Sequence, residues 1–268
     1  MELVLLACAM LLTGAVGGVL AGLLGIGGGI VIVPVLDTVL SFYGTDPAIR
    51  MQVAVATSLA TIIPTSISSS RAHHLRNAVD LALVRRWAFF VLTGSVAGAL
   101  IASRVHSDVL SMVFAVMAFL IAIKLLLPLE GRRLADAVPG GPLMPFVPTF
   151  IGGVSSMMGI GGGTLSVATL TLFNQPIHRA VGTAALFGLV ISLPGTIGFM
   201  VSGFGDPRLP PYSIGFVNLV GLALIAPATW LTAPLGAALA HRLTHRQLSL
   251  SFGIFLLLVS MRMLGRAL

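Results

Sequence analysis

Long apolar runs separated by short polar connections dominate this sequence of 268 residues. A membrane-spanning helix needs about 20 predominantly apolar residues. With 57% hydrophobic and 9% charged residues, the chain holds apolar runs that are too long and too numerous for one soluble core. The pattern predicts an all-α integral membrane protein with about eight hydrophobic segments, which are Leu3–Leu40, Val53–Ser69, Val84–Ser103, Val109–Leu127, Leu143–Phe173, Ala180–Phe204, Ser213–Ala240 and Leu248–Leu264.

Two of these segments are interrupted by three successive glycines. The first reads GLLGIGGGIVIVPVL and the second reads MMGIGGGTLSV. Glycine costs roughly 1 kcal/mol relative to alanine in a helix interior, so each run predicts a broken helix. The glycines concerned are Gly27, Gly28 and Gly29 in the first segment and Gly161, Gly162 and Gly163 in the second.

The glycine element is part of a longer internal repeat. The matched stretches are GIGGG at 25–29 and 159–163, DPAIR at 46–50 and QPIHR at 175–179, and GALIASRV at 98–105 and GAALAHRL at 236–243. Because the matches occur in the same order, they predict a first membrane repeat at 1–127 and a second at 143–268. The intervening residues 128–142 are rich in charge, proline and glycine and predict a linker.

The lengths of the broken segments bear on how the two repeats are oriented. Leu3–Leu40 has 38 residues, about 57 Å as a helix, whereas the apolar core of a bilayer is about 30 Å thick. The 11 residues Ile30–Leu40 reach only about 17 Å and cannot cross alone. A re-entrant or broken helix gives each half an odd number of crossings, which favours inverted over parallel repeats. The distribution of Lys and Arg between the runs fits both arrangements.

Charge and composition exclude several classes of protein. The net charge of +7 arises from residues between apolar runs, which is typical of membrane proteins rather than of nucleic-acid binding. Cys8 is the only cysteine, so the chain predicts no internal disulfide and no thiolate metal site. The eight acidic residues are scattered, which argues against an enzyme, a metal or a cofactor. No P-loop lysine follows the glycines, so a nucleotide site is rejected.

The doubled glycine element, the P-x-x-R stretches and the two-halved length resemble the sulfite exporter TauE/SafE family, over nearly the whole chain. The resemblance implies a multi-pass carrier of the bacterial cytoplasmic (inner) membrane that exports sulfite or small organosulfonates such as sulfoacetate. Import, or transport of another small organic or inorganic anion, is the alternative. The potential partners are a small anion and the lipid bilayer, with no ATPase subunit evident. The sequence leaves the anion, the direction, proton coupling and the oligomeric state open.

The physics of a helix start suggests where such an anion would bind. The first N–H groups of a helix lack intrahelical partners and carry about half a positive charge. Two restarted helices could therefore form an anion cradle from the two glycine runs and Thr164. Glycine can equally serve helix contact, as expected for Gly14, Gly18, Gly22, Gly94 and Gly98.

Polar residues near the breaks are further candidates. Hydroxyls of Thr57, Ser58 and Thr183 could donate to an anion, although such hydroxyls often bond their own backbone. Arg50 and Arg179 could attract anions at an entrance or extend to the membrane interface. Asp37 lies alone in an apolar run and is a candidate for proton coupling or an ion pair.

Overall fold

The apolar runs fold into helices, as their pattern predicts. The computed structural model describes residues 2–24, 27–127, 143–239 and 245–267. The predicted linker at 128–142, and Gly25 and Ile26 of the first glycine element, lie outside the described residues. The helices are α1 (Glu2–Leu24), α2 (Gly29–Phe42), α3 (Arg50–His74), α4 (Leu81–Ala102), α5 (Ser107–Leu126), α6 (Leu143–Met158), α7 (Gly163–Leu172), α8 (Ile177–Ser202), α9 (Leu219–Leu239) and α10 (His245–Ala267).

Helix length separates spanning helices from short ones. Among the residues that the structure describes, five helices, α3, α4, α5, α8 and α9, are long and apolar enough to cross a membrane. By contrast, α2 has 14 residues and α7 has 10, about 21 Å and 15 Å of helix, so neither crosses a bilayer alone. The fold is therefore that of an all-α, multi-pass membrane protein.

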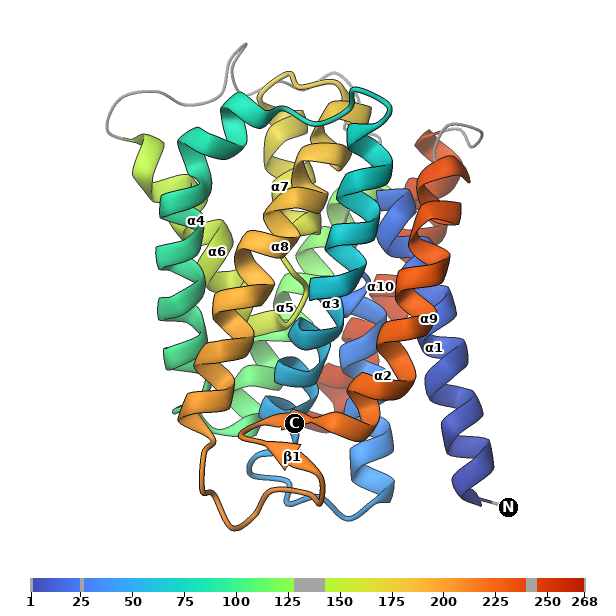
Figure 1. Cartoon of the computed structure of the whole chain (residues 1–268), viewed down its shortest axis with the longest axis vertical. Coiled ribbons are helices and arrows are strands. Elements are labelled where there is room, and N and C mark those ends of the chain that lie inside the picture. Colours follow the sequence, from blue (N-terminus) through green and yellow to red (C-terminus); the bar gives the residue numbers. More distant parts are fainter. Residues whose placement is uncertain (1, 25–26, 128–142, 240–244, 268) are drawn as a thin grey trace.

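Helices α3 and α8 form the centre of the molecule, and α3 is the most buried of the five candidate spans (Figure 1). The two helices pack against each other in opposite directions. Gly182 near the start of α8 faces His73 near the end of α3, and Gly195 near the end of α8 faces Leu59. Around this centre, α1 packs on α9, α4 on α6, and α5 on α10.

Small residues allow two of the outer pairs to approach closely. A Cβ built on Gly14 would lie 2.8 Å from the carbonyl oxygen of Ile225 in α9, and one on Gly22 would overlap the carbonyl of Ala233. In the same way, Gly94 and Gly98 of α4 lie against the backbone of α6. The prediction that these glycines serve helix contact is confirmed, because a methyl group at any of them would collide with backbone.

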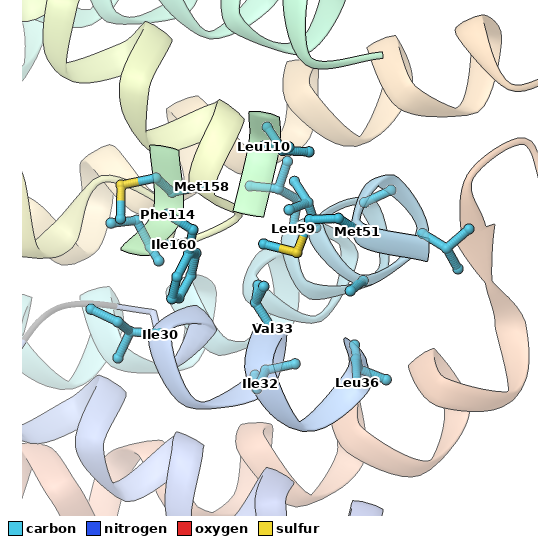
Figure 2. Close-up of a cluster of buried hydrophobic side chains, with 14 of the residues drawn as sticks. Ile30, Ile32, Val33, Leu36, Met51, Leu59, Leu110, Phe114, Met158 and Ile160 are labelled. Carbon is cyan, nitrogen blue, oxygen red and sulfur yellow. The ribbon is translucent and has the colours of Figure 1, made fainter. Parts of the chain in front are cut away.

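An apolar cluster fills the space between α2, α3 and α5 (Figure 2). Ile32 and Leu36 of α2, Leu59 of α3, and Leu110 and Phe114 of α5 are almost completely inaccessible. Burial of such side chains contributes about 1.5–3 kcal/mol each relative to water. The cluster holds the short helix α2 inside the protein although it is too short to span the membrane.

The helix predicted from Ser213 begins six residues later in the structure. Ser213–Ala240 was expected to be a continuous apolar helix, but its first six residues form a hairpin of two short strands, β1 (Ser213–Ile214) and β2 (Val217–Asn218), and α9 begins at Leu219. The strands pair antiparallel, with Ser213 opposite Asn218. Gly215, with φ of 53°, provides the turn that a helix could not contain.

Candidate functional site

The glycine runs interrupt the helices where the sequence predicts. The first interruption separates α1, which ends at Leu24, from α2, which begins at Gly29, and the second separates α6 from α7. Gly28 (φ 76°) and Gly162 (φ 74°) are the residues that precede α2 and α7, and both have left-handed backbone. Only glycine adopts this conformation without strain, which explains why the break requires it.

The two interruptions meet beside α3 although they are far apart in the sequence. A Cβ on Gly29 would overlap the carbonyl oxygen of Gly159, and Ser58 Oγ of α3 donates a hydrogen bond of 2.8 Å to that same oxygen. Ile62 lies between the runs, since Cβ atoms on Gly27 and Gly161 would be 3.0 Å and 2.8 Å from its Cγ2. The starts of α2 and α7 therefore belong to one buried region.

Buried hydroxyl groups surround the second interruption. Ser155 Oγ of α6 lies 3.4 Å from the position of a Cβ on Gly162, and Thr164 is in the first turn of α7. Ser66 Oγ of α3 lies against Gly188 of α8. A Cβ on Gly188 would meet this hydroxyl and would also lie 3.3 Å from the carbonyl oxygen of Gly161, so Ser66 is close to the second interruption. Among the described residues, the three hydroxyls of Ser66, Ser155 and Thr164 are buried and have no hydrogen-bond partner.

Thr57 and Thr183 have a different environment from the one expected. Thr57 Oγ1 accepts the backbone N–H of Asn218 and Thr183 Oγ1 accepts that of Asp80, both at 2.9 Å. Asp80 caps α4, and Asn218 immediately precedes α9. These two hydroxyls accept hydrogen bonds at the starts of α9 and α4. Of the three candidate hydroxyls Thr57, Ser58 and Thr183, it is Ser58 that contacts the glycine breaks.

The charged candidates lie in ion pairs away from the breaks. Arg50 Nε contacts Asp37 Oδ1 at 2.9 Å, which ties the end of α2 to the start of α3. Arg179, half exposed, lies 3.6 Å from Asp80. Arg50 precedes Ile62 by 12 residues, about 18 Å along α3. The ion pair favours a structural role for Asp37. Arg50 is too far along α3 to contact the buried region at the glycine breaks.

The buried region differs in its chemistry from a metal site. No group of three or more His, Cys, Asp or Glu side chains is placed there so that it could hold a metal ion. The chemistry of the buried region is instead that of neutral hydrogen-bond donors, namely hydroxyls and the first backbone N–H groups of α2 and α7.

Comparison with known proteins extends over nearly the whole chain. The family model described as Sulfite exporter TauE/SafE matches residues 10–263. A probable membrane transporter protein of Haemophilus influenzae is 34% identical over 258 residues, covering 94% of this chain and 96% of the relative. The probable membrane transporter protein YunE of Bacillus subtilis is 28% identical, covering 95% and 96%. No solved structure matches the chain.

Proposed function

Because the chain belongs to the sulfite exporter TauE/SafE family, we propose that it exports small sulfur oxyanions or organosulfonates, such as sulfite and sulfoacetate-like anions. Family and fold make it a multi-pass membrane transporter. We assign it to the inner membrane of a bacterium, where an inside-negative potential favours anion exit by about 2.3 kcal/mol per charge per 100 mV. Export therefore needs no ATPase.

The observation that carries this proposal is the meeting of two helix starts inside the protein. Gly29 at the start of α2 meets the carbonyl of Gly159 beside Ser58 of α3, and Gly27 and Gly161 both lie against Ile62. Each helix start presents N–H groups and the positive end of a helix dipole, which together favour an anion. Broken helices that meet within a bundle are the usual substrate site of secondary transporters.

We expect purified protein in liposomes loaded with sulfite to release the anion when the interior is made negative. The release should accelerate as the potential grows, because each exported charge gains about 2.3 kcal/mol per 100 mV. The rate is measured for sulfite, methanesulfonate, sulfate and chloride, under argon to prevent sulfite oxidation. Liposomes without protein are the control. Absence of sulfite and sulfonate flux in both directions would contradict the proposal, and flux in the inward direction alone would favour import.

We further propose that the halves are inverted repeats. The antiparallel course of α3 and α8, which occupy matching places in the two halves, supports this. So does the recurrence of contacts, because α1 packs on α9 as α6 packs on α4. In Figure 1 the connection after α2 lies at the bottom of the molecule and the connection after α7 at the top.

Cysteine labelling tests the orientation of the repeats. Pro47 and Pro176 occupy matching positions in the two repeats, and both are exposed. In a Cys8→Ala background, Pro47→Cys and Pro176→Cys should react with a membrane-impermeant maleimide from opposite sides of the membrane. Labelling of both cysteines from one side would support parallel repeats. Cell lysis before labelling, which exposes both sides, is the control for reactivity.

A further inference from the structure

The two glycine breaks match in sequence but differ in the residues that line them. In the first break, α2 continues with Ile30 and Ile32, which are completely buried in an apolar surrounding (Figure 2). At the matching places, 134 residues later, α7 has Thr164 and Ser166. Ser155, which precedes the second break, corresponds to Ala21 in the first half. Among the described residues, the hydroxyl that reaches the start of α2 is that of Ser58, and it is already bonded to the carbonyl oxygen of Gly159. The hydroxyls without a partner gather at the start of α7.

The hydroxyls at the second break belong to a larger set of buried hydroxyls that have no partner among the described residues, which also includes Thr45, Ser69, Ser156, Ser166, Ser192 and Thr196. The exposed fraction of the residue is at most 1% for Ser66 and Ser155 and 6% for Thr164. None of the three hydroxyls has a hydrogen-bond partner among the described residues. A buried polar group without a partner is unfavourable, because it has lost its bonds to water. Three such groups from α3, α6 and α7 around one helix start indicate that they are completed by a ligand.

On the basis of the proposed function, we infer that the transporter has a single anion site, at the start of α7 rather than at both breaks. In this site Thr164, Ser155 and Ser66 donate hydrogen bonds to the oxygens of the anion. Backbone N–H groups of the first turn of α7 complete the donors, because the first intrahelical bond of the turn runs from Ser166 N–H to the carbonyl of Gly162. The start of α2 forms an apolar wall.

The chemistry of this site selects a class of ligand. Several donors that approach from different helices match an anion with three oxygens, such as sulfite or the head of a sulfonate. Chloride has one centre and satisfies fewer of these directions at once. Arg50 and Arg179 do not belong to this site. They lie near the starts of the antiparallel helices α3 and α8, where each is paired with an aspartate. A cationic side chain that does contact α7 is Lys124 of α5, which donates to the carbonyl oxygen of Ala168, one turn beyond Thr164.

Isosteric removal of one hydroxyl tests the inference. Thr164→Val keeps the size and branching of the side chain and removes the donor. We expect the half-saturating concentration of sulfite and of methanesulfonate in the liposome assay to rise at least tenfold, with a smaller effect on chloride flux. Ser155→Ala and Ser66→Ala should act in the same direction, and Thr164→Ser should restore the parent value.

Matched variants elsewhere separate this effect from a general loss of buried hydroxyls. Thr229→Val in α9 and Ser260→Ala in α10 also remove buried hydroxyls, but those hydroxyls bond carbonyl oxygens of their own helices. We expect both variants to keep the parent half-saturation. Melting of each purified variant shows that it is folded, and Ser155→Ala and Ser66→Ala provide the measurement if Thr164→Val does not fold.

Two failures can be distinguished. If the parent protein moves sulfite or methanesulfonate and Thr164→Val, Ser155→Ala and Ser66→Ala do so with unchanged half-saturation, the inferred site is wrong while the proposed function stands. The same holds if Thr164→Ser behaves like Thr164→Val. If the parent protein moves neither anion, the proposed function is wrong and the inference falls with it.

Discussion

Gly29→Ala is expected to destabilise the protein more than any other single substitution in the glycine runs. A methyl group at Gly29 would overlap the backbone carbonyl of Gly159 and lie 2.8 Å from the Cα of Ile160. Overpacking usually costs 1–3 kcal/mol, and here the obstacle is backbone, which cannot rotate away. We expect a loss of about 3 kcal/mol in the free energy of unfolding, measured by thermal melting in detergent.

Gly265→Ala is the matched control for this experiment. Gly265 lies in α10, and an added Cβ would meet nothing within 4 Å. Since alanine favours helix over glycine by roughly 1 kcal/mol, Gly265→Ala should match or exceed the parent stability. Parent-like melting of Gly29→Ala would mean that the two breaks do not touch, and the argument for one shared buried region would fail.

Gly162→Ala is expected to abolish most transport while the protein remains folded. A methyl group at this position would meet the flexible end of the Ile191 side chain and would lie 3.4 Å from Ser155 Oγ. The left-handed backbone costs alanine about 1–2 kcal/mol. The larger effect is functional, because the methyl group occupies the space beside the inferred hydroxyl donors. We expect sulfite flux to fall at least tenfold, equivalent to about 1.4 kcal/mol.

Gly44→Ala controls for the backbone strain in this comparison. Gly44 has a similar φ of 69°, but an added Cβ meets nothing within 4 Å. Gly44→Ala should therefore lose similar stability and keep its transport. Gly28→Ala should lose more stability than either, because its methyl group would lie 2.6 Å from the carbonyl oxygen of Gly17. Full sulfite flux through Gly162→Ala would place the anion elsewhere.

The helix breaks could be predicted from sequence because three glycines within an apolar run have few structural explanations. The left-handed residues at Gly28 and Gly162 follow directly from that pattern. The contact between the two breaks could not be predicted, because it depends on how α3 and α8 cross. The same is true of the pair between Arg50 and Asp37, which forms only when α2 folds back along α3.

The candidate site was predicted in part. Thr164 was identified because it follows the second glycine run, but Ser155 and Ser66 were missed. Ser155 stands four residues before GIGGG, and Ser66 belongs to a serine-rich stretch of α3. Hydropathy alone does not show which of several serines in such a stretch lacks a partner. The sequence also did not show that the hydroxyl oxygens of Thr57 and Thr183 accept backbone N–H groups at the starts of α9 and α4.

The close glycine contacts of the outer helices limit how this protein can move. Helix α1, from the first half of the sequence, is locked against α9 from the second, and α4 from the first half is locked against α6 from the second. Each of these pairs therefore combines one helix from each half of the sequence, so the two halves are packed into each other. A rigid-body opening that keeps these close contacts would therefore move α1 together with α9, and α4 together with α6, rather than one half of the sequence against the other.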